Sequence, residues 1–173
     1  LGRLMEHFYA VCPQGVTNDR YGGVHSDFLT SEYQHFGASE SASVWENCRG
    51  VGLSFGYNRN EGPEQYLDGP AAVRHLLDVV TRGGRLLLNV GPKADGSIPE
   101  EQIAALDGLA EFMGPYKAET VRGAVLDTPL ESTGWARGLR HADHATLFVS
   151  ADASEVRGLP SGVDWSRATS RCA

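Results

Sequence analysis

The sequence GGRLLLNVG at residues 83–91 decides the fold class of this chain. Its short, continuous apolar run at 85–90 is typical of a parallel strand that is buried on both faces. Helical periodicity precedes this run at 70–82 and resumes at 97–113, which gives the order helix, strand, helix. We therefore expect an α/β domain built on a parallel sheet.

The two helices beside this strand carry their own start and stop signals. Pro70 suits a first helical turn, and Gly83-Gly84 supplies the stop. Ser97 and Glu100 have the spacing of a capping box before the second helix, and Gly114-Pro115 is predicted to end it.

The stretch before these helices is less regular. A helix is predicted at 1–11, and short strands are predicted at 15–18 and within 44–53. Between 22 and 43 no periodicity is found, and a loop of this length in a compact domain is usually functional or disordered. Polar clusters follow the predicted strands, which is where parallel sheets bind their ligands.

The pattern changes after about residue 120. Short strands are predicted within 121–132 and at 146–150, separated by Gly, Asp and Pro, with no long helical period. We expect residues 1–119 to form one unit and residues 120–173 to begin a separate β-rich domain. The chain of 173 residues is long enough for one domain and a small second one.

Composition excludes several classes of protein. The formal charge of −7 argues against nucleic-acid binding, which needs a basic face. No apolar run reaches the roughly 20 residues of a membrane span, and no signal peptide opens the chain. Three cysteines are too few and too scattered for a disulfide framework or a zinc site. The chain starts within a helical run at Leu1 rather than Met, so we expect a fragment; compartment and oligomeric state are left open.

The richest chemistry lies between residues 18 and 58. This stretch contains a fixed cation, several carboxylates, histidines and many aromatic rings. A site for a small polar ring needs aromatic faces, hydrogen-bonding groups for hydroxyls and a carboxyl group that moves a proton. Arg20, Glu32 and Phe55 are the best candidates for these three roles.

Four segments in this region carry a family resemblance. They are NDRYGG at 18–23, DFLTSEY at 27–33, WENCRGVGLSFGYN at 45–58 and GGRLLLNVGPKADGSIPEEQ at 83–102. In order and spacing they resemble the α-L-fucosidases of glycoside hydrolase family 29, over most of residues 13–115. Each segment alone is a weak signal, whereas the ordered set is specific.

The resemblance implies a fold and an activity. Residues 1–119 would be the C-terminal half of a (β/α)₈ TIM-type barrel, and residues 120–173 the start of a C-terminal β-sandwich. The reaction would be hydrolysis of terminal α-L-fucosyl residues from oligosaccharides or glycoconjugates, with retention and without a metal or cofactor. Glu32 matches the general acid/base, Arg20 an arginine that contacts the sugar, and Phe55 an aromatic that lines the fucose pocket. The nucleophilic aspartate would lie upstream of Leu1, so the fragment alone would be inactive.

Each candidate also has a structural alternative. Glu32 suits proton transfer if partial burial among Tyr33, His35 and Phe36 favours its protonated form; otherwise it is a solvated loop carboxylate. Glu46 is the rival proton donor, or a structural partner of Arg49 or Arg20. Arg20 could instead form an ion pair with Asp19 or Asp27, and Phe55 could be core packing.

Two other functions stay open at this point. One is a fucose-binding pseudoenzyme without hydrolytic activity, whose upstream aspartate has been lost. The other is a methyltransferase-like α/β domain, which is disfavoured because no GxGxxG loop follows a strand. Linkage and aglycone preference are not encoded in any pattern that we recognise.

Overall fold

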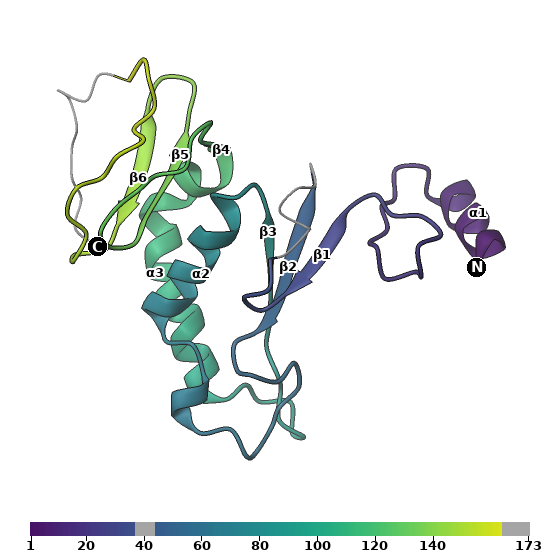
Figure 1. The fold of residues 1–173 in the computed structure, drawn as a ribbon. Helices are drawn as coiled ribbons and strands as arrows, with labels where there is room; N and C mark the ends of the chain where they lie inside the picture. The colour runs from purple at the N-terminus through teal and green to yellow at the C-terminus, as the bar shows by residue number, and fades with distance from the viewer. Residues whose placement is uncertain (37–43, 164–173) are drawn as a thin grey trace.

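The computed structural model describes residues 1–36 and 44–163. Its elements in chain order are α1 (Gly2–Val11), β1 (Leu29–Glu32), β2 (Trp45–Gly50), the 3₁₀-helix η2 (Pro63–Gln65), α2 (Gly69–Val80), β3 (Arg85–Asn89), α3 (Glu100–Arg122), β4 (Ala124–Val125), β5 (Ala136–Arg140) and β6 (Ala145–Val149). Figure 1 shows α2 and α3 side by side, with α1 at the opposite end of the molecule.

The first three strands form a parallel sheet in the order β1-β2-β3. In its register Glu32 lies opposite Cys48, and Cys48 lies opposite Leu87. Helix α2 makes the crossover between β2 and β3, which is the usual connection between parallel neighbours. The predicted α/β class with a parallel sheet is confirmed.

The core lies between this sheet and its two helices. Its buried centre is Val51, Ala72 and Ala105, and the partly buried residues packed against it are Tyr66, Leu67, Leu88, Val90 and Leu109. Helices α2 and α3 approach closely at two glycines, because a Cβ atom on Gly69 would lie 3.0 Å from the Cα atom of Gly108. This contact requires residues without side chains on both helices.

The expected burial of β3 on both faces is wrong for the described residues. Arg85 and Leu87 are exposed, and Leu87 keeps 50% of its surface accessible. The reason is that α2 and α3 cover only one face of the sheet (Figure 1). The strand itself forms where it was predicted.

Helix α3 does not end at Gly114-Pro115 as predicted. It continues to Arg122 with Pro115 inside it. Packing outweighs the lost backbone hydrogen bond: the Phe112 ring lies 5.2 Å from the Tyr116 ring and 6.0 Å from the Phe148 ring, and Thr120 is buried. Within the described residues, no helix combines the length and apolarity needed to cross a membrane.

The N-terminal strands differ from the prediction. Residues 15–18 form no strand, and only Asn18 makes an isolated bridge, with Phe28. Strand β1 lies inside the stretch that was predicted as a loop, of which residues 37–43 lie outside the described part. The helix predicted at 1–11 and the strand predicted within 44–53 are confirmed by α1 and β2.

A second sheet, β4-β5-β6, is antiparallel. It packs on α3 through Phe148 and on α2 through Asp78, which accepts hydrogen bonds from Trp135 Nε1 at 3.2 Å and Arg137 Nε at 2.6 Å. The change from helices to strands after residue 120 is confirmed, although β5 was not predicted.

Candidate functional site

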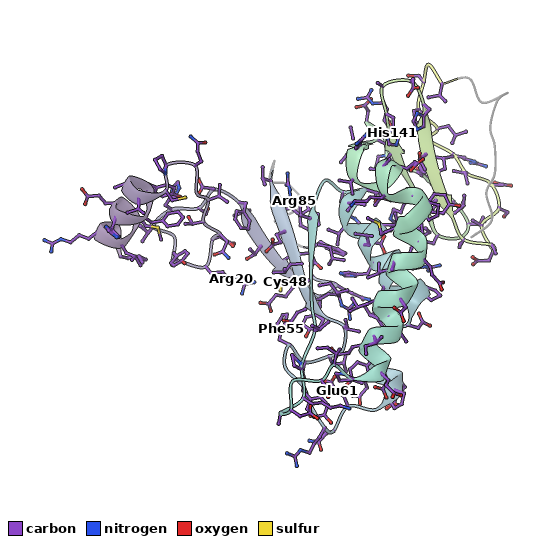
Figure 2. The ribbon with its side chains drawn as sticks, turned by 180° about the vertical axis from the view of Figure 1, so that it is seen from behind. Arg20, Cys48, Phe55, Glu61, Arg85 and His141 are labelled. Carbon is purple, nitrogen blue, oxygen red and sulfur yellow. The ribbon has the colours of Figure 1, made fainter. Side chains whose placement is uncertain are left out.

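The open face of the parallel sheet carries the candidate residues. Successive strand side chains alternate between the two faces. In β2, Trp45, Asn47 and Arg49 are buried, and Asn47 contacts His75 of α2, so this set faces the helices. Figure 2 shows Arg20, Cys48 and Phe55 on the side away from α3.

Arg20 and Glu32 form an ion pair at this face. The Nη1 atom of Arg20 lies 2.8 Å from Oε1 of Glu32, and its Nε donates to Thr30 Oγ1 at 2.7 Å. Thr30 in turn donates from Oγ1 to Asp19 Oδ1 at 2.6 Å and from its backbone N–H at 3.0 Å. Asp19 therefore orients the threonine that holds the guanidinium. Among the described residues, neither of the alternative partners, Asp19 and Asp27, forms an ion pair with Arg20.

Glu32 is the last residue of β1, at the carboxyl end of the strand. Its side chain is 43% exposed and therefore only partly buried. It lies near the thiol of Cys48 on the neighbouring strand. Burial raises the pKa of that thiol, the Glu46 and Glu32 carboxylates raise it further, and Arg20 opposes them. Glu32, Glu46 and Arg20 thus lie close enough to the Cys48 thiol to act on its pKa.

Glu46, the rival carboxylate, lies on the same face. Its register neighbours are Thr30 on β1 and Arg85 on β3. It forms no ion pair with Arg49 or Arg20; Arg49 Nε instead donates to the carbonyl of Gly50 at 2.9 Å. Trp45, beside it, is buried and donates from Nε1 to the Arg82 carbonyl at 3.2 Å, which makes it a core anchor.

Phe55 lies in the loop that follows β2. Its ring lies 5.3 Å from the Tyr33 ring, and the Asn89 amide donates to its backbone carbonyl. The residue is 39% exposed, so it is not part of the core of the described residues. The Phe55 ring thus contacts the residue that directly follows Glu32 in the chain.

Asp27 fixes the loop that carries Arg20. It accepts hydrogen bonds from the Tyr9 hydroxyl at 2.5 Å and from the Thr17 backbone N–H at 2.7 Å, and its other oxygen lies 3.2 Å from His25 Nε2. The hydrogen bond from Tyr9, then those from Thr17 and His25, lower the pKa of Asp27 to about 2. Asp27 therefore connects α1 to the 17–27 loop.

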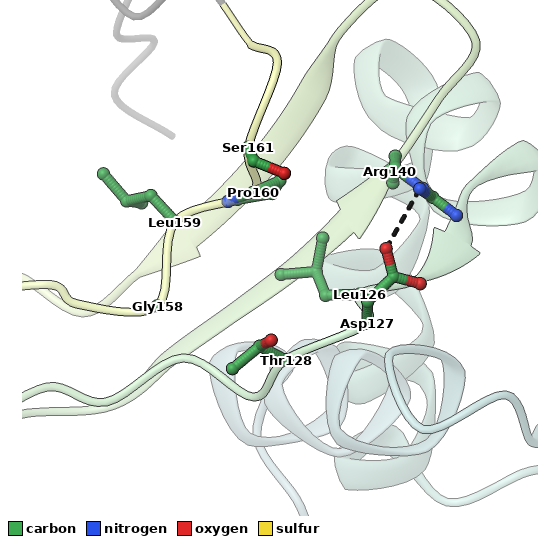
Figure 3. Close-up of a pocket in the computed structure, with 8 residues that line it drawn as sticks. All are labelled: Leu126, Asp127, Thr128, Arg140, Gly158, Leu159, Pro160 and Ser161. Atoms are coloured by element: carbon green, nitrogen blue, oxygen red, sulfur yellow. Dashed lines mark ion pairs between the residues drawn. The ribbon is translucent and has the colours of Figure 1, made fainter.

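Two cavities lie elsewhere, and neither is lined by Arg20, Glu32 or Phe55. One, of about 190 Å³, lies at the antiparallel sheet beside the ion pair of Arg140 and Asp127 (Figure 3). The other, of about 300 Å³, is more apolar and lies between α1 and the loop that contains Tyr21. The candidate residues lie on the open face of the sheet, outside both of these cavities.

The comparisons with known proteins agree on one family. A model of the α-L-fucosidase family matches residues 3–118. The chain belongs to the α-L-fucosidase family. Plasma α-L-fucosidase of Homo sapiens is 39% identical over 113 residues, which are 61% of this chain and 24% of that protein. The α-L-fucosidase of Dictyostelium discoideum is 32% identical over 114 residues, which are 63% of this chain and 24% of that protein.

Solved structures give the same result for the fold. The structure of Thermotoga maritima α-fucosidase in complex with fucose is 39% identical, with a TM-score of 0.73, over 85% of this chain and 34% of that one. α-L-fucosidase isoenzyme 1 from Paenibacillus thiaminolyticus, at 23% identity and a TM-score of 0.69, shares the fold. The chain spans about a quarter of these curated fucosidases and about a third of the solved ones.

One buried group at the site was not singled out from the sequence. Asn47 contacts Ser31, Tyr33 and His75 through its amide. A signal was present, because His75 lies on the apolar face of α2 with Ala72 and Val79. A polar residue on such a face needs a buried partner.

Proposed function

We propose that the complete protein hydrolyses terminal α-L-fucosyl residues of oligosaccharides or glycoconjugates with retention. Family membership supports the reaction class. The observation that carries the residue assignment is the ion pair of Arg20 with Glu32 at the carboxyl end of β1, on the face where Phe55 lies. A cation, a carboxyl group and an aromatic ring at one strand end are the parts that a sugar site requires.

In the first step of this reaction, Glu32 would protonate the glycosidic oxygen while an aspartate attacks the anomeric carbon. The aspartate would come from a part of the protein upstream of this chain. Glu32 must carry a proton at this stage. Arg20 would therefore release the carboxylate and turn its donors toward the sugar hydroxyls.

In the second step Glu32 would take a proton from water, which attacks the fucosyl-enzyme intermediate and restores the aspartate. This step needs the carboxylate form of Glu32, and the Arg20 guanidinium lies 2.8 Å from it as a hydrogen-bond donor. Phe55 would contact an apolar face of the sugar through its exposed ring.

The same proposal covers the domains. Residues 1–119 would belong to the C-terminal half of a (β/α)₈ barrel, with β1, β2 and β3 as three of its strands and the open sheet face toward the interior. Residues 120–173 would begin a β-sandwich that contains β4, β5 and β6. Since the proposal places the nucleophile outside residues 1–173, these residues expressed alone should show no turnover.

The test uses the full-length protein and an aryl α-L-fucoside. Glu32→Ala should lower kcat/KM by roughly 10²- to 10⁴-fold, and azide should restore part of the rate by attacking the intermediate in place of activated water. Glu46→Ala is the matched control, since it removes a carboxylate from the same sheet face. It should cost little and gain nothing from azide.

Three other results would change the proposal. If Glu46→Ala shows the azide-rescued loss and Glu32→Ala does not, the proton donor is Glu46. If the initial product has the inverted anomeric configuration by NMR, the double displacement is wrong. If calorimetry detects fucose binding and no substrate is turned over, the protein is a fucose-binding pseudoenzyme.

A further inference from the structure

The amide of Asn47 holds both neighbours of Glu32. Asn47 lies in the middle of β2 and is fully buried, at 0% exposure. Its Nδ2 atom donates to the Ser31 hydroxyl and to the Tyr33 carbonyl, each at 2.9 Å. Both hydrogens of one amide are therefore used on the residues directly before and after the candidate acid/base.

The chemistry of the partners fixes how this amide is oriented. A carbonyl oxygen can only accept, so the atom that faces the Tyr33 carbonyl must be the amide nitrogen. The Oδ1 atom of Asn47 then faces Nε2 of His75 at 2.8 Å. Since Oδ1 can only accept, Nε2 of His75 carries the hydrogen of this bond.

His75 is suited to be a neutral donor. It lies on α2, directly behind the sheet, and is 6% exposed. Burial lowers its pKa to about 4; the charge of Arg49 and then that of Arg82 act in the same direction, and Asp78 opposes them. The imidazole is thus uncharged near neutral pH and can keep one N–H directed at Asn47.

Tyr33 joins this network to the rest of the site. Its backbone has φ of +51°, which an L-residue adopts only when the surroundings hold it. Its N–H donates to the Cys48 carbonyl at 3.1 Å, and its hydroxyl donates to the Leu53 carbonyl at 2.8 Å. Its ring contacts Phe55. The conformation of Tyr33 therefore affects both the position of Glu32, which directly precedes it, and the position of the Phe55 ring, which it contacts.

We propose that Asn47 and His75 are positioning residues, which fix the backbone of residues 31–33 and so aim the Glu32 carboxyl at the scissile bond. The inference rests on the proposed fucosidase activity. Neither side chain touches the substrate, because both lie on the helix side of the sheet. A misplacement of about 1 Å at a catalytic group can cost roughly 100-fold in rate.

The experiment compares two substrates in the full-length protein. Phenyl α-L-fucoside needs its leaving oxygen protonated, whereas 2,4-dinitrophenyl α-L-fucoside leaves without help. Asn47→Ala should lower kcat/KM for the phenyl substrate by about 10- to 100-fold and for the dinitrophenyl substrate clearly less. His75→Gln keeps an N–H donor near Asn47 and should recover much of the rate that His75→Ala loses.

The matched control is Thr81→Ala. Thr81 is also buried and lies at the C-terminal end of α2. The substitution removes one hydrogen bond, which the Thr81 hydroxyl donates to the Leu77 carbonyl at 2.6 Å. This hydrogen bond lies within α2, so the ratio of the two substrate rates should stay at the parent value. Ser31→Ala, a milder change in the network, replaces Asn47→Ala if that variant does not fold.

The outcomes separate the two proposals. Equal losses on both substrates in the Asn47 and Ser31 variants, as for Thr81→Ala, overturn the positioning role. If Glu32→Ala itself loses both substrates equally, the acid role of Glu32 is wrong. In that case amide hydrogen exchange tests the positioning role independently of enzyme activity. Faster exchange at the Tyr33 amide in Asn47→Ala than in Thr81→Ala supports the positioning role, and unchanged exchange contradicts it.

Discussion

The guanidinium of Arg20 and the carboxylate of Glu32 meet at 2.8 Å although they come from different elements, the 17–27 loop and the end of β1. Both side chains are about half exposed, so the pair contributes little to stability. Its position at a strand end, with Thr30 and Asp19 fixing the arginine, is what its proposed role in a sugar site requires.

Arg20→Lys should weaken substrate use more than it weakens the fold. Lysine cannot direct one nitrogen to Thr30 and a second to Glu32 or a sugar hydroxyl at the same time. Loss of a hydrogen bond that involves a charged group costs about 1.5–3 kcal/mol, so kcat/KM for an aryl fucoside should fall roughly 10- to 100-fold. Arg59→Lys, in an exposed turn, is the control and should leave kcat/KM unchanged. Equal values for Arg20→Lys and the parent would remove Arg20 from the sugar site.

Protonation of His75 should make the protein less stable in acid. Its pKa falls from 6.5 to about 4 on folding, so the unfolded chain takes up the proton first as the pH decreases. The stability contribution is complete above about pH 6.5 and is lost between 6.5 and about 4, by up to roughly 3 kcal/mol. Thermal unfolding of the parent and of His75→Gln across this range measures the difference. If the gap between the two is independent of pH, His75 is not buried in its neutral form.

The contact of Gly69 with Gly108 should make Gly108→Ala destabilising. Alanine raises helix propensity by about 1 kcal/mol, but its Cβ would overlap Gly69, and such overpacking costs about 1–3 kcal/mol. Gly114→Ala, in the same helix but with open space around it, should change stability by no more than about 0.5 kcal/mol, since Pro115 restricts the residue before it. Denaturant unfolding of both variants compares them, and similar values would contradict the close helix contact.

Elements with strong hydrophobic periodicity were predictable from the sequence, and elements held by tertiary contacts were not. Helix α2 and strand β3 follow from apolar spacing and terminal glycines. Strand β1, with the sequence LTSE, has one apolar residue and is a strand because β2 pairs with it. Helix α3 continues past Pro115 because aromatic rings from β6 and its own next turn pack around it.

The candidate site was predictable only in part. Arg20, Glu32 and Phe55 stood out from the residue types between 18 and 58, the family resemblance supplied a role for each, and these roles remain predictions. Their mutual placement depends on backbone register and loop conformation, which a single sequence does not contain. The link from His75 to Asn47 joins residues 28 positions apart through polar atoms, so no apolar pattern reveals its partner.

Helix α3 contacts both sheets, so its length fixes how the two sheets are oriented relative to each other. Its 23 residues extend over about 35 Å. Near its first turn Gln102 accepts a hydrogen bond from the Gly91 N–H after β3, and near its middle Phe112 packs on Phe148 of β6. One inserted residue between these contacts would turn the antiparallel sheet by about 100° and move it by about 1.5 Å. Chimeras with other members of the α-L-fucosidase family should therefore be joined outside this helix. Insertions and deletions in α3 should be tolerated less well than substitutions on its solvent-facing side.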